Sequence, residues 1–241
     1  MSHYELPKRR RIFLMRHGDV TYFDDSGRAI DPESVPLNER GREEASAAGR
    51  EFAAQGVHFD RVIASGMPRT IETARRVLEE TGQSPEVEIW PEWQEIRGGH
   101  LRDLSTGDIE RAFLSVFDGV VPEDVRFLGG ETIGQLLDRV LPGVARLRAD
   151  ATWDTVLLVL HGGVNRALLS HAITAGGRAF FGHLSQATGC INALDVGDKP
   201  GDWVIHAVNH SPPSPLHTGV RNTTMELLYA QFLRYKAHDM K

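Results

Sequence analysis

Short apolar runs alternate with longer amphipathic stretches along the chain. Runs of four to six apolar residues between turn-forming residues are typical of buried strands, whereas apolar positions three or four apart indicate helices. Strands are expected at 12–15, 61–65, 87–90, 155–160, 190–196 and 203–208. Helices are expected at 39–55, 68–80, 108–117, 132–149, 164–175 and 224–235. This alternation predicts an α/β fold with a largely parallel central sheet.

Three of the expected helices carry start signals. Asn38 stands where an N-cap is needed before the helix at 39–55. Pro68 suits the first turn of the next helix, because proline there lacks only a hydrogen bond that the helix start does not make. Thr132 followed three residues later by Gln135 forms a capping-box pattern. These signals fix where three of the expected helices begin.

The middle and the end of the chain depart from the alternation. Residues 91–130 are less regular and predict a helical insertion over the sheet edge that helps to shape the site. Prolines and serines at 211–215 predict a linker, and a helix with an apolar stripe follows it. We therefore expect a main domain at 1–210 and a tail at 211–241, whose helix packs on the body or on a second subunit of a homodimer.

Composition narrows the class of protein. The 241 residues carry a formal net charge of −6, which argues against a general nucleic-acid binder. The single cysteine, Cys190, excludes an internal disulfide framework and a cysteine-based zinc site, and it fits a reducing compartment. Basic residues at 8–11 precede only four apolar residues, too few for an export signal. No window approaches the roughly 18 apolar residues of a membrane span. We expect a cytoplasmic protein without a membrane or nucleic-acid partner.

Two of the expected strands end in a histidine beside glycine. The first is followed by Arg16-His17-Gly18 and the fourth by His161-Gly162-Gly163. Ligands in open α/β sheets bind beyond the carboxyl ends of the strands, so both histidines are expected in one pocket. Ser65 ends the second strand, and Arg69 falls in the first turn of the helix after it. The sequence thus predicts a pocket of histidines, arginines and helix-start amides.

These side chains suit a phosphoryl group. Arginine forks bind phosphate oxygens in a bidentate way, and helix N-termini add amide donors. One histidine can act as a covalent nucleophile toward phosphorus, while a second, protonated histidine holds the oxygens as charge develops. The alternative is a metal site that combines the histidines with Asp19, Asp24 or Asp25, although their spacing is not that of a tight ligand set.

Further motifs follow in a fixed order around the strand ends. They are Leu-Met-Arg-His-Gly at 14–18, Pro-Leu-Asn-Glu-Arg-Gly at 36–41, Ser-Gly-Met-Pro-Arg-Thr-Ile-Glu-Thr-Ala at 65–74, Glu95-Ile96 with Gly99, Gly-Gly-Glu-Thr at 129–132 and His-Gly-Gly-Val-Asn-Arg at 161–166. In this order they resemble the histidine phosphatase superfamily, with its phosphoglycerate-mutase-like fold, over residues 11–210. The resemblance implies a three-layer α/β/α sandwich that hydrolyses a small phosphorylated substrate without metal or cofactor.

The resemblance also implies a role for each matching residue. His17 is the nucleophile that becomes phosphohistidine, and Glu95 is the general acid that later activates water. Arg16, Arg69 and His161 also count as catalytic, because they clamp the phosphoryl group. The implied phosphate-binding set is Arg16, Arg69, His161, Gly162 and Ser65.

Four of the singled-out residues have a second interpretation from the sequence. Glu95 could be a solvated surface acid, and Ser65 could serve only to cap the following helix. Arg166 is expected to brace its loop or bind a carboxylate rather than touch phosphate, and His100 is expected on the surface.

The chain departs from the family pattern in places that bear on activity. Val20 stands where many relatives carry a hydroxyl, and Phe23 where asparagine is common. Residues 101–103 replace a frequent Trp-Glu-Gly, and 96–100 lack the tyrosine of a mutase-type Arg-Arg-His-Tyr-Gly stretch. We therefore favour a phosphatase. A phosphoglycerate-mutase-type isomerase and a catalytically impaired phosphate-binding regulatory protein remain the alternatives.

Overall fold

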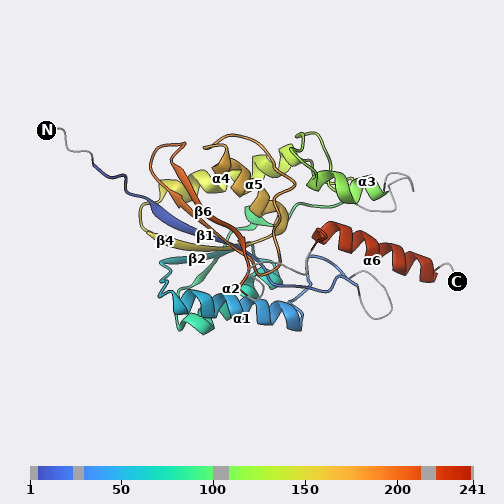
Figure 1. Cartoon of the computed structure of the whole chain (residues 1–241), viewed down its shortest axis with the longest axis horizontal. Helices are drawn as coiled ribbons and strands as arrows, with labels where there is room; N and C mark the ends of the chain where they lie inside the picture. The colour runs from blue at the N-terminus through green and yellow to red at the C-terminus, as the bar shows by residue number, and fades with distance from the viewer. Residues whose placement is uncertain (1–4, 24–29, 100–108, 213–220, 240–241) are drawn as a thin grey trace.

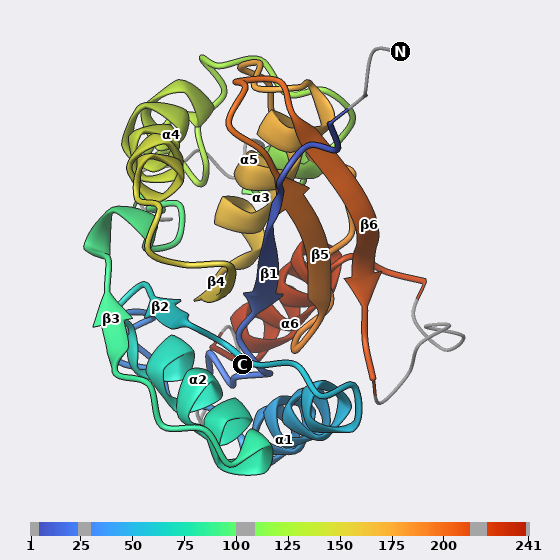
Figure 2. The same ribbon diagram turned by 90° about the vertical axis from the view of Figure 1, so that its left-hand side faces the viewer.

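The computed structural model of the chain describes residues 5–23, 30–99, 109–212 and 221–239. These residues form a six-stranded sheet in the order β3-β2-β4-β1-β5-β6, which Figure 2 shows from one edge to the other. The strands are β1 Arg10–Arg16, β2 Arg61–Ala64, β3 Val87–Ile89, β4 Thr155–Leu160, β5 Ile191–Val196 and β6 Trp203–His210. The four strands from β3 to β1 pair in parallel, whereas β5 is antiparallel to both β1 and β6. The predicted α/β fold with a largely parallel sheet is confirmed.

Helices cover both faces of the sheet (Figure 1). The main helices are α1 Glu39–Ala54, α2 Pro68–Thr81, α4 Ile133–Ala149 and α5 Gly162–Ile173. Figure 1 shows α1 and α2 on one face and α4 and α5 on the other. Alternate residues of β1 serve the two faces: Phe13 and Met15 pack with Phe52 of α1, while Ile12 and Leu14 join the core under α4 and α5. This alternation follows from the period of two along a strand and produces the three layers.

The predicted helix starts are confirmed in detail. The Asn38 side chain accepts a hydrogen bond from the Gly41 amide at 2.8 Å, so it is the N-cap of α1. The Thr132 side chain accepts from the Gln135 amide at 3.1 Å, and the Gln135 side chain accepts from the Thr132 amide at 2.9 Å, which completes the capping box of α4. The helix expected at 164–175 begins earlier, at Gly162, directly after β4.

The insertion and the tail meet in the described part of the chain. The insertion contributes a short helix, α3 Ile109–Leu114, and the tail contributes α6 Thr224–Asp239; Figure 1 shows both at one end of the molecule. The Phe113 ring lies 5.3 Å from that of Tyr229 and 5.6 Å from that of Phe232. The tail helix therefore contacts the insertion. The division into two parts and a second subunit stay predictions, and residues 100–108, with His100, lie outside the described residues.

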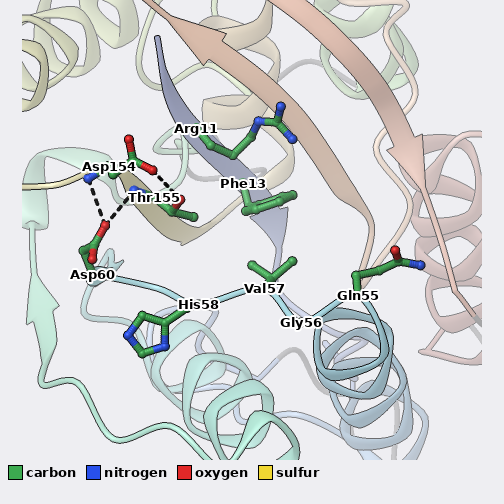
Figure 3. Close-up of a pocket in the computed structure, with 9 residues that line it drawn as sticks. All are labelled: Arg11, Phe13, Gln55, Gly56, Val57, His58, Asp60, Asp154 and Thr155. Atoms are coloured by element: carbon green, nitrogen blue, oxygen red, sulfur yellow. Dashed lines mark hydrogen bonds between the residues drawn. The ribbon is translucent and has the colours of Figure 1, made fainter. Parts of the chain in front are cut away.

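A surface pocket of about 480 Å³ lies at the amino-terminal ends of β1 and β4, away from the strand ends that carry the histidines (Figure 3). Arg11, Phe13 and His58 are among its lining residues. Its charged groups already have partners in the fold: Asp60 accepts hydrogen bonds from two backbone amides, and Arg11 pairs with Asp195. None of the helices among the described residues is long and apolar enough to cross a membrane.

Candidate active site

The ends of β1 and β4 bring His17 and His161 together. These neighbouring parallel strands pair Arg16 with Leu160, and the histidines follow directly. The His17 amide donates to the Leu160 carbonyl at 3.0 Å, and the two imidazole rings lie 5.2 Å apart, edge to face. Only 2% of His17 and 0% of His161 is exposed. The predicted meeting of the two histidines in one place is confirmed.

His17 is held as a neutral imidazole with one unprotonated ring nitrogen. Its Nδ1 lies 2.7 Å from the Gly18 carbonyl, which can only accept, so Nδ1 carries the proton. Its Nε2 lies 3.2 Å from Nε of Arg69, which donates to it. Burial lowers the pKa of His17 well below its usual range, and the charges of Arg69 and Arg16 lower it further. Nε2 therefore keeps its lone pair, as a nucleophile must.

Gly18 is required where the chain leaves β1. A Cβ atom at this position would lie 2.2 Å from the carbonyl oxygen of Gly41, because the start of α1 passes directly over the backbone. The Gly18 amide also donates to the Thr73 hydroxyl of α2 at 3.1 Å. The loop after His17 is thus fixed against both helices of that face.

Two buried arginines flank the histidines. Arg69 lies in the first turn of α2, where its remaining guanidinium nitrogens donate to the Pro32 carbonyl and to the Met67 sulfur. Arg16 ends β1 and donates through Nη1 to the Gln186 carbonyl at 2.6 Å and to the Thr224 hydroxyl at 3.0 Å. Two fixed positive charges beside two neutral imidazoles form a site suited to an anion.

Two polar atoms in this cluster have no partner among the described residues. They are Nε of Arg16 and Nδ1 of His161, both buried. Gly162 lies beside them: a Cβ added there would approach Arg16 Nε to 3.5 Å, and Gly162 opens helix α5. Buried polar groups usually find hydrogen-bond partners, so such groups at a helix start fit an anionic ligand.

Ser65 contacts His161. Its hydroxyl lies 2.7 Å from Nε2 of His161 and 3.1 Å from the Thr70 hydroxyl. It is fully buried, and it lies 3.5 Å from the Met67 amide at the start of α2. The N-cap position of α2 is occupied by Met67, which makes no side-chain cap. The interpretation of Ser65 as the helix cap is therefore wrong, and its main contact is with the imidazole.

The expectation that a protonated His161 holds the phosphoryl oxygens as charge develops stays a prediction, and without substrate the ring is neutral. Burial lowers the pKa of His161 well below its usual range, followed by the effects of His17, Arg69 and Arg16. At neutral pH the ring is uncharged. A phosphoryl anion would act in the opposite direction, because a nearby negative charge favours the charged imidazolium.

Glu95 lies at the same helix start as His161. Its carboxylate oxygens each lie 3.1 Å from the Gly163 amide, and Oε1 accepts from the Ile96 amide at 2.9 Å. The surface-acid interpretation is therefore wrong, because the carboxylate is bonded two residues after His161. Helix N-termini favour negative side chains of this kind.

Arg166 braces the loop, one of the two interpretations from the sequence. Its Nη1 donates to the Gly162 carbonyl at 3.0 Å and its Nε to the Gly182 carbonyl at 2.9 Å. Its guanidinium lies over the Phe117 ring, 4.7 Å from the centroid. Burial lowers the pKa of Arg166 to about 10.

Sequence reasoning missed Gln186 and the tail residue Thr224 as partners of Arg16. A buried amide network lies behind this arginine: the Gln186 side-chain oxygen is bonded by the amide group of Asn192, whose own oxygen accepts from the Asn209 amide. Gln186 stands in a loop outside every recognised motif. For Thr224, the sequence predicted only that the tail helix begins there, and not that it contacts Arg16.

The metal alternative gains no support from the described residues, among which no group of three or more His, Cys, Asp or Glu side chains could hold an ion. Asp19 instead accepts a hydrogen bond from the Asn38 side chain at 2.8 Å. Asp24 and Asp25 lie outside the described residues.

Because the two histidines are buried, we expect the free energy of unfolding to depend on pH. In the unfolded chain His17 binds a proton below its ordinary pKa of about 6.5, whereas in the fold it stays neutral. As the pH falls below about 6.5, the unfolded chain takes up a proton at His17 that the folded protein does not. The free energy of unfolding therefore becomes smaller as the pH falls. We expect thermal denaturation followed by circular dichroism to give a Tm that falls from about pH 7.5 to about pH 5.5, with a smaller fall in His17→Gln.

The exposed His58 provides the control, because His58→Gln should leave the Tm-versus-pH slope as in the wild type. An unchanged slope in His17→Gln would contradict the assignment of a depressed pKa to His17.

Comparison with known proteins agrees with this geometry. The sequence profile of the Histidine phosphatase superfamily (branch 1) matches residues 12–211. The adenosylcobalamin/alpha-ribazole phosphatase of Escherichia coli (strain K12) is 32% identical over 196 residues, which cover 78% of this chain and 91% of that protein. A 2,3-bisphosphoglycerate-dependent phosphoglycerate mutase of Lactiplantibacillus plantarum is 30% identical over 66% of this chain and 81% of its own length. The crystal structure of the alpha-ribazole phosphatase from Shigella flexneri superposes with a TM-score of 0.63 at 27% identity, covering 83% of this chain and 96% of that one.

The chain belongs to the histidine phosphatase superfamily. It is a phosphatase-type hydrolase of phosphate monoesters, and the activity class predicted from the sequence is confirmed.

Proposed function

We propose that this protein hydrolyses phosphate monoesters of small molecules through a phosphohistidine on His17, without a metal ion. The observation that carries the proposal is the unprotonated Nε2 of His17, which accepts from Arg69 Nε at 3.2 Å while Nδ1 donates to the Gly18 carbonyl. In the first step Nε2 attacks phosphorus and the bond from phosphorus to the ester oxygen breaks. Glu95 enters this step as the carboxylic acid and gives its proton to the leaving oxygen, which leaves Glu95 as a carboxylate. In the second step Glu95 removes a proton from water, whose oxygen displaces His17 from phosphorus.

The cluster around His17 supplies positive charge and donors for the transferred group. Arg16, Arg69 and the Gly162 amide hold phosphoryl oxygens, and His161 donates through Nδ1 once the bound anion has raised its pKa. Ser65 contributes by fixing the ring of His161 through Nε2 at 2.7 Å. Preorganised donors that match developing charge are the largest source of rate enhancement in such sites. Two arginines make a metal or another cofactor unnecessary for this charge stabilisation.

One relative at 30% identity is a phosphoglycerate mutase, so the test of the proposal also measures mutase activity. A mutase forms the same phosphohistidine but returns the phosphoryl group to a bound product instead of to water. The two activities differ in a directly measurable product, inorganic phosphate.

A screen of purified protein tests the proposal. The panel comprises sugar phosphates, phosphoglycerates, nucleoside monophosphates, α-ribazole 5′-phosphate and a phosphopeptide, assayed with excess EDTA and with His17→Ala as the blank. We expect steady, multiple-turnover release of phosphate from at least one small monoester, with no loss on EDTA treatment.

Three other results would contradict parts of the proposal. Interconversion of 2- and 3-phosphoglycerate without phosphate release would favour the mutase. Loss of activity with EDTA, restored by one divalent ion, would favour the metal alternative. Binding of inorganic phosphate without turnover on the whole panel would indicate a phosphate-binding regulatory protein.

A further inference from the structure

We infer that Arg139 of α4 is a positioning residue for the acid Glu95. It holds the backbone of the segment that carries this glutamate, residues 92–97, which we call the acid strap. The inference rests on the proposed function, because it concerns the residue proposed there as proton donor.

Arg139 makes five hydrogen bonds, three of them to the acid strap. Its Nη1 donates to the Glu92 and Gln94 carbonyls, each at 2.8 Å, and its Nη2 donates to the Glu95 carbonyl at 3.3 Å. The remaining two bonds go to the carboxylate of Glu131, at 3.0 Å from Nε and 2.8 Å from Nη2. All five N–H groups of the guanidinium therefore have acceptors, either in the acid strap or on Glu131.

Glu131 extends the same hold to the far end of the strap. Its carboxylate accepts from the Arg97 amide at 3.0 Å, and its own amide donates to the Arg97 carbonyl at 2.8 Å. The Arg139 and Glu131 side chains are only 15% and 9% exposed, so their ion pair is largely shielded from water. Both ends of the acid strap are therefore fixed to the start of α4 by one ion pair.

The strap depends on these contacts because, after a short 3₁₀ turn at Pro91–Trp93, it has no regular secondary structure. Buried carbonyl groups without a helix or sheet ladder need other donors. A lysine offers three donors on a point charge and cannot reproduce the planar fork that reaches three carbonyls and a carboxylate.

The fixed backbone determines where the Glu95 carboxylate lies. Both of its oxygens accept from the Gly163 amide two residues after His161, and Oε1 also accepts from the neighbouring Ile96 amide. Arg139 bonds the carbonyl of the same residue. Proton transfer requires the acid within hydrogen-bond reach of the leaving oxygen, and a misplacement of about 1 Å can cost about 10²-fold in rate.

Arg139→Gln tests the inference through its dependence on the leaving group. A displaced acid should slow an alkyl phosphate, whose leaving oxygen needs a proton, and spare p-nitrophenyl phosphate, whose leaving group departs unprotonated. We expect kcat/KM, which reports formation of the phosphoenzyme, to fall on the order of 10²-fold for the alkyl phosphate and by less than about 5-fold for p-nitrophenyl phosphate. In the Glu95→Gln background the same substitution should add almost nothing, because the group it positions is already disabled.

Two further variants test whether the geometry of the Arg139 guanidinium matters, rather than its charge or the loss of any arginine from α4. Arg139→Lys keeps the charge but loses the fork, and it should show the same substrate pattern at an intermediate size. Arg146→Gln is the matched control: it lies on the same helix and pairs with the Glu92 side chain at 2.6 Å, but is 57% exposed, and it should leave both rates unchanged. Circular dichroism and Tm are recorded for every variant.

The outcomes distinguish this inference from the proposed function. If Glu95→Gln shows the leaving-group pattern while Arg139→Gln and Arg139→Lys slow both substrates equally, the positioning role is overturned and Arg139 is only structural. Full activity of Arg139→Lys would likewise overturn it, since charge alone would suffice. If Glu95→Gln itself lacks the pattern, the failure belongs to the proposed acid. Should Arg139→Gln not fold, the Arg139→Lys result decides.

Discussion

Replacement of His17 by alanine should abolish phosphate release and the phosphoenzyme together. Among the described residues, the imidazole of His17 is the nucleophile that lies beside both Arg16 and Arg69 with an unprotonated ring nitrogen, so its loss removes the atom to which phosphorus would bond. Loss of a covalent nucleophile costs on the order of 10³-fold in kcat or more. Rapid acid-free quench of the wild type with ³²P-labelled substrate should trap an acid-labile, base-stable phosphoprotein, and His17→Ala should trap none.

His58→Ala is the matched control, because this histidine is exposed and lines the pocket at the other end of the strands. It should retain wild-type turnover and labelling. If His17→Ala kept a tenth of the wild-type activity, or if the label survived acid as a phosphoserine would, His17 would not be the nucleophile.

The parts of this site that the sequence predicts are those set by strand ends and helix starts. His17 and His161 follow two apolar runs, and a parallel sheet necessarily brings the carboxyl ends of neighbouring strands to one edge. Arg69 follows from Pro68, because the proline marks a first helical turn whose side chains point back toward the strand end. These are local rules that act over fewer than about ten residues.

The parts that the sequence did not predict depend on contacts between distant segments. The hold of Arg139 on the acid strap joins residues more than 40 positions apart, and no local pattern encodes it. The tail residue Thr224 reaches Arg16 across 208 positions. The lowered pKa of His161 without substrate was also outside the reach of the sequence, since it depends on complete burial among positive groups, which only the packed fold reveals.

Glu95→Gln should separate poor from good leaving groups. Glutamine has the same shape, and its side-chain oxygen can still accept from the Gly163 and Ile96 amides that hold the carboxylate, so the strap should stay in place. It cannot give a proton to an ester oxygen. We expect kcat/KM, which reports formation of the phosphoenzyme, to fall by about 10²- to 10⁴-fold for an alkyl phosphate, the usual contribution of general acid catalysis, and by less than about 10-fold for p-nitrophenyl phosphate.

With the good leaving group, the second step, hydrolysis of the phosphoenzyme, can also be measured. With p-nitrophenyl phosphate the first step needs no acid, but Glu95 is still required as the base that activates water. In Glu95→Gln the phosphoenzyme should therefore accumulate, and a burst of nitrophenol should precede a slower steady rate. Glu92→Gln provides the control, because Glu92 lies on the same strap and pairs with the exposed Arg146. Equal losses on both substrates without a burst would mark Glu95 as structural, and the acid would then be sought in the insertion, starting with Asp103.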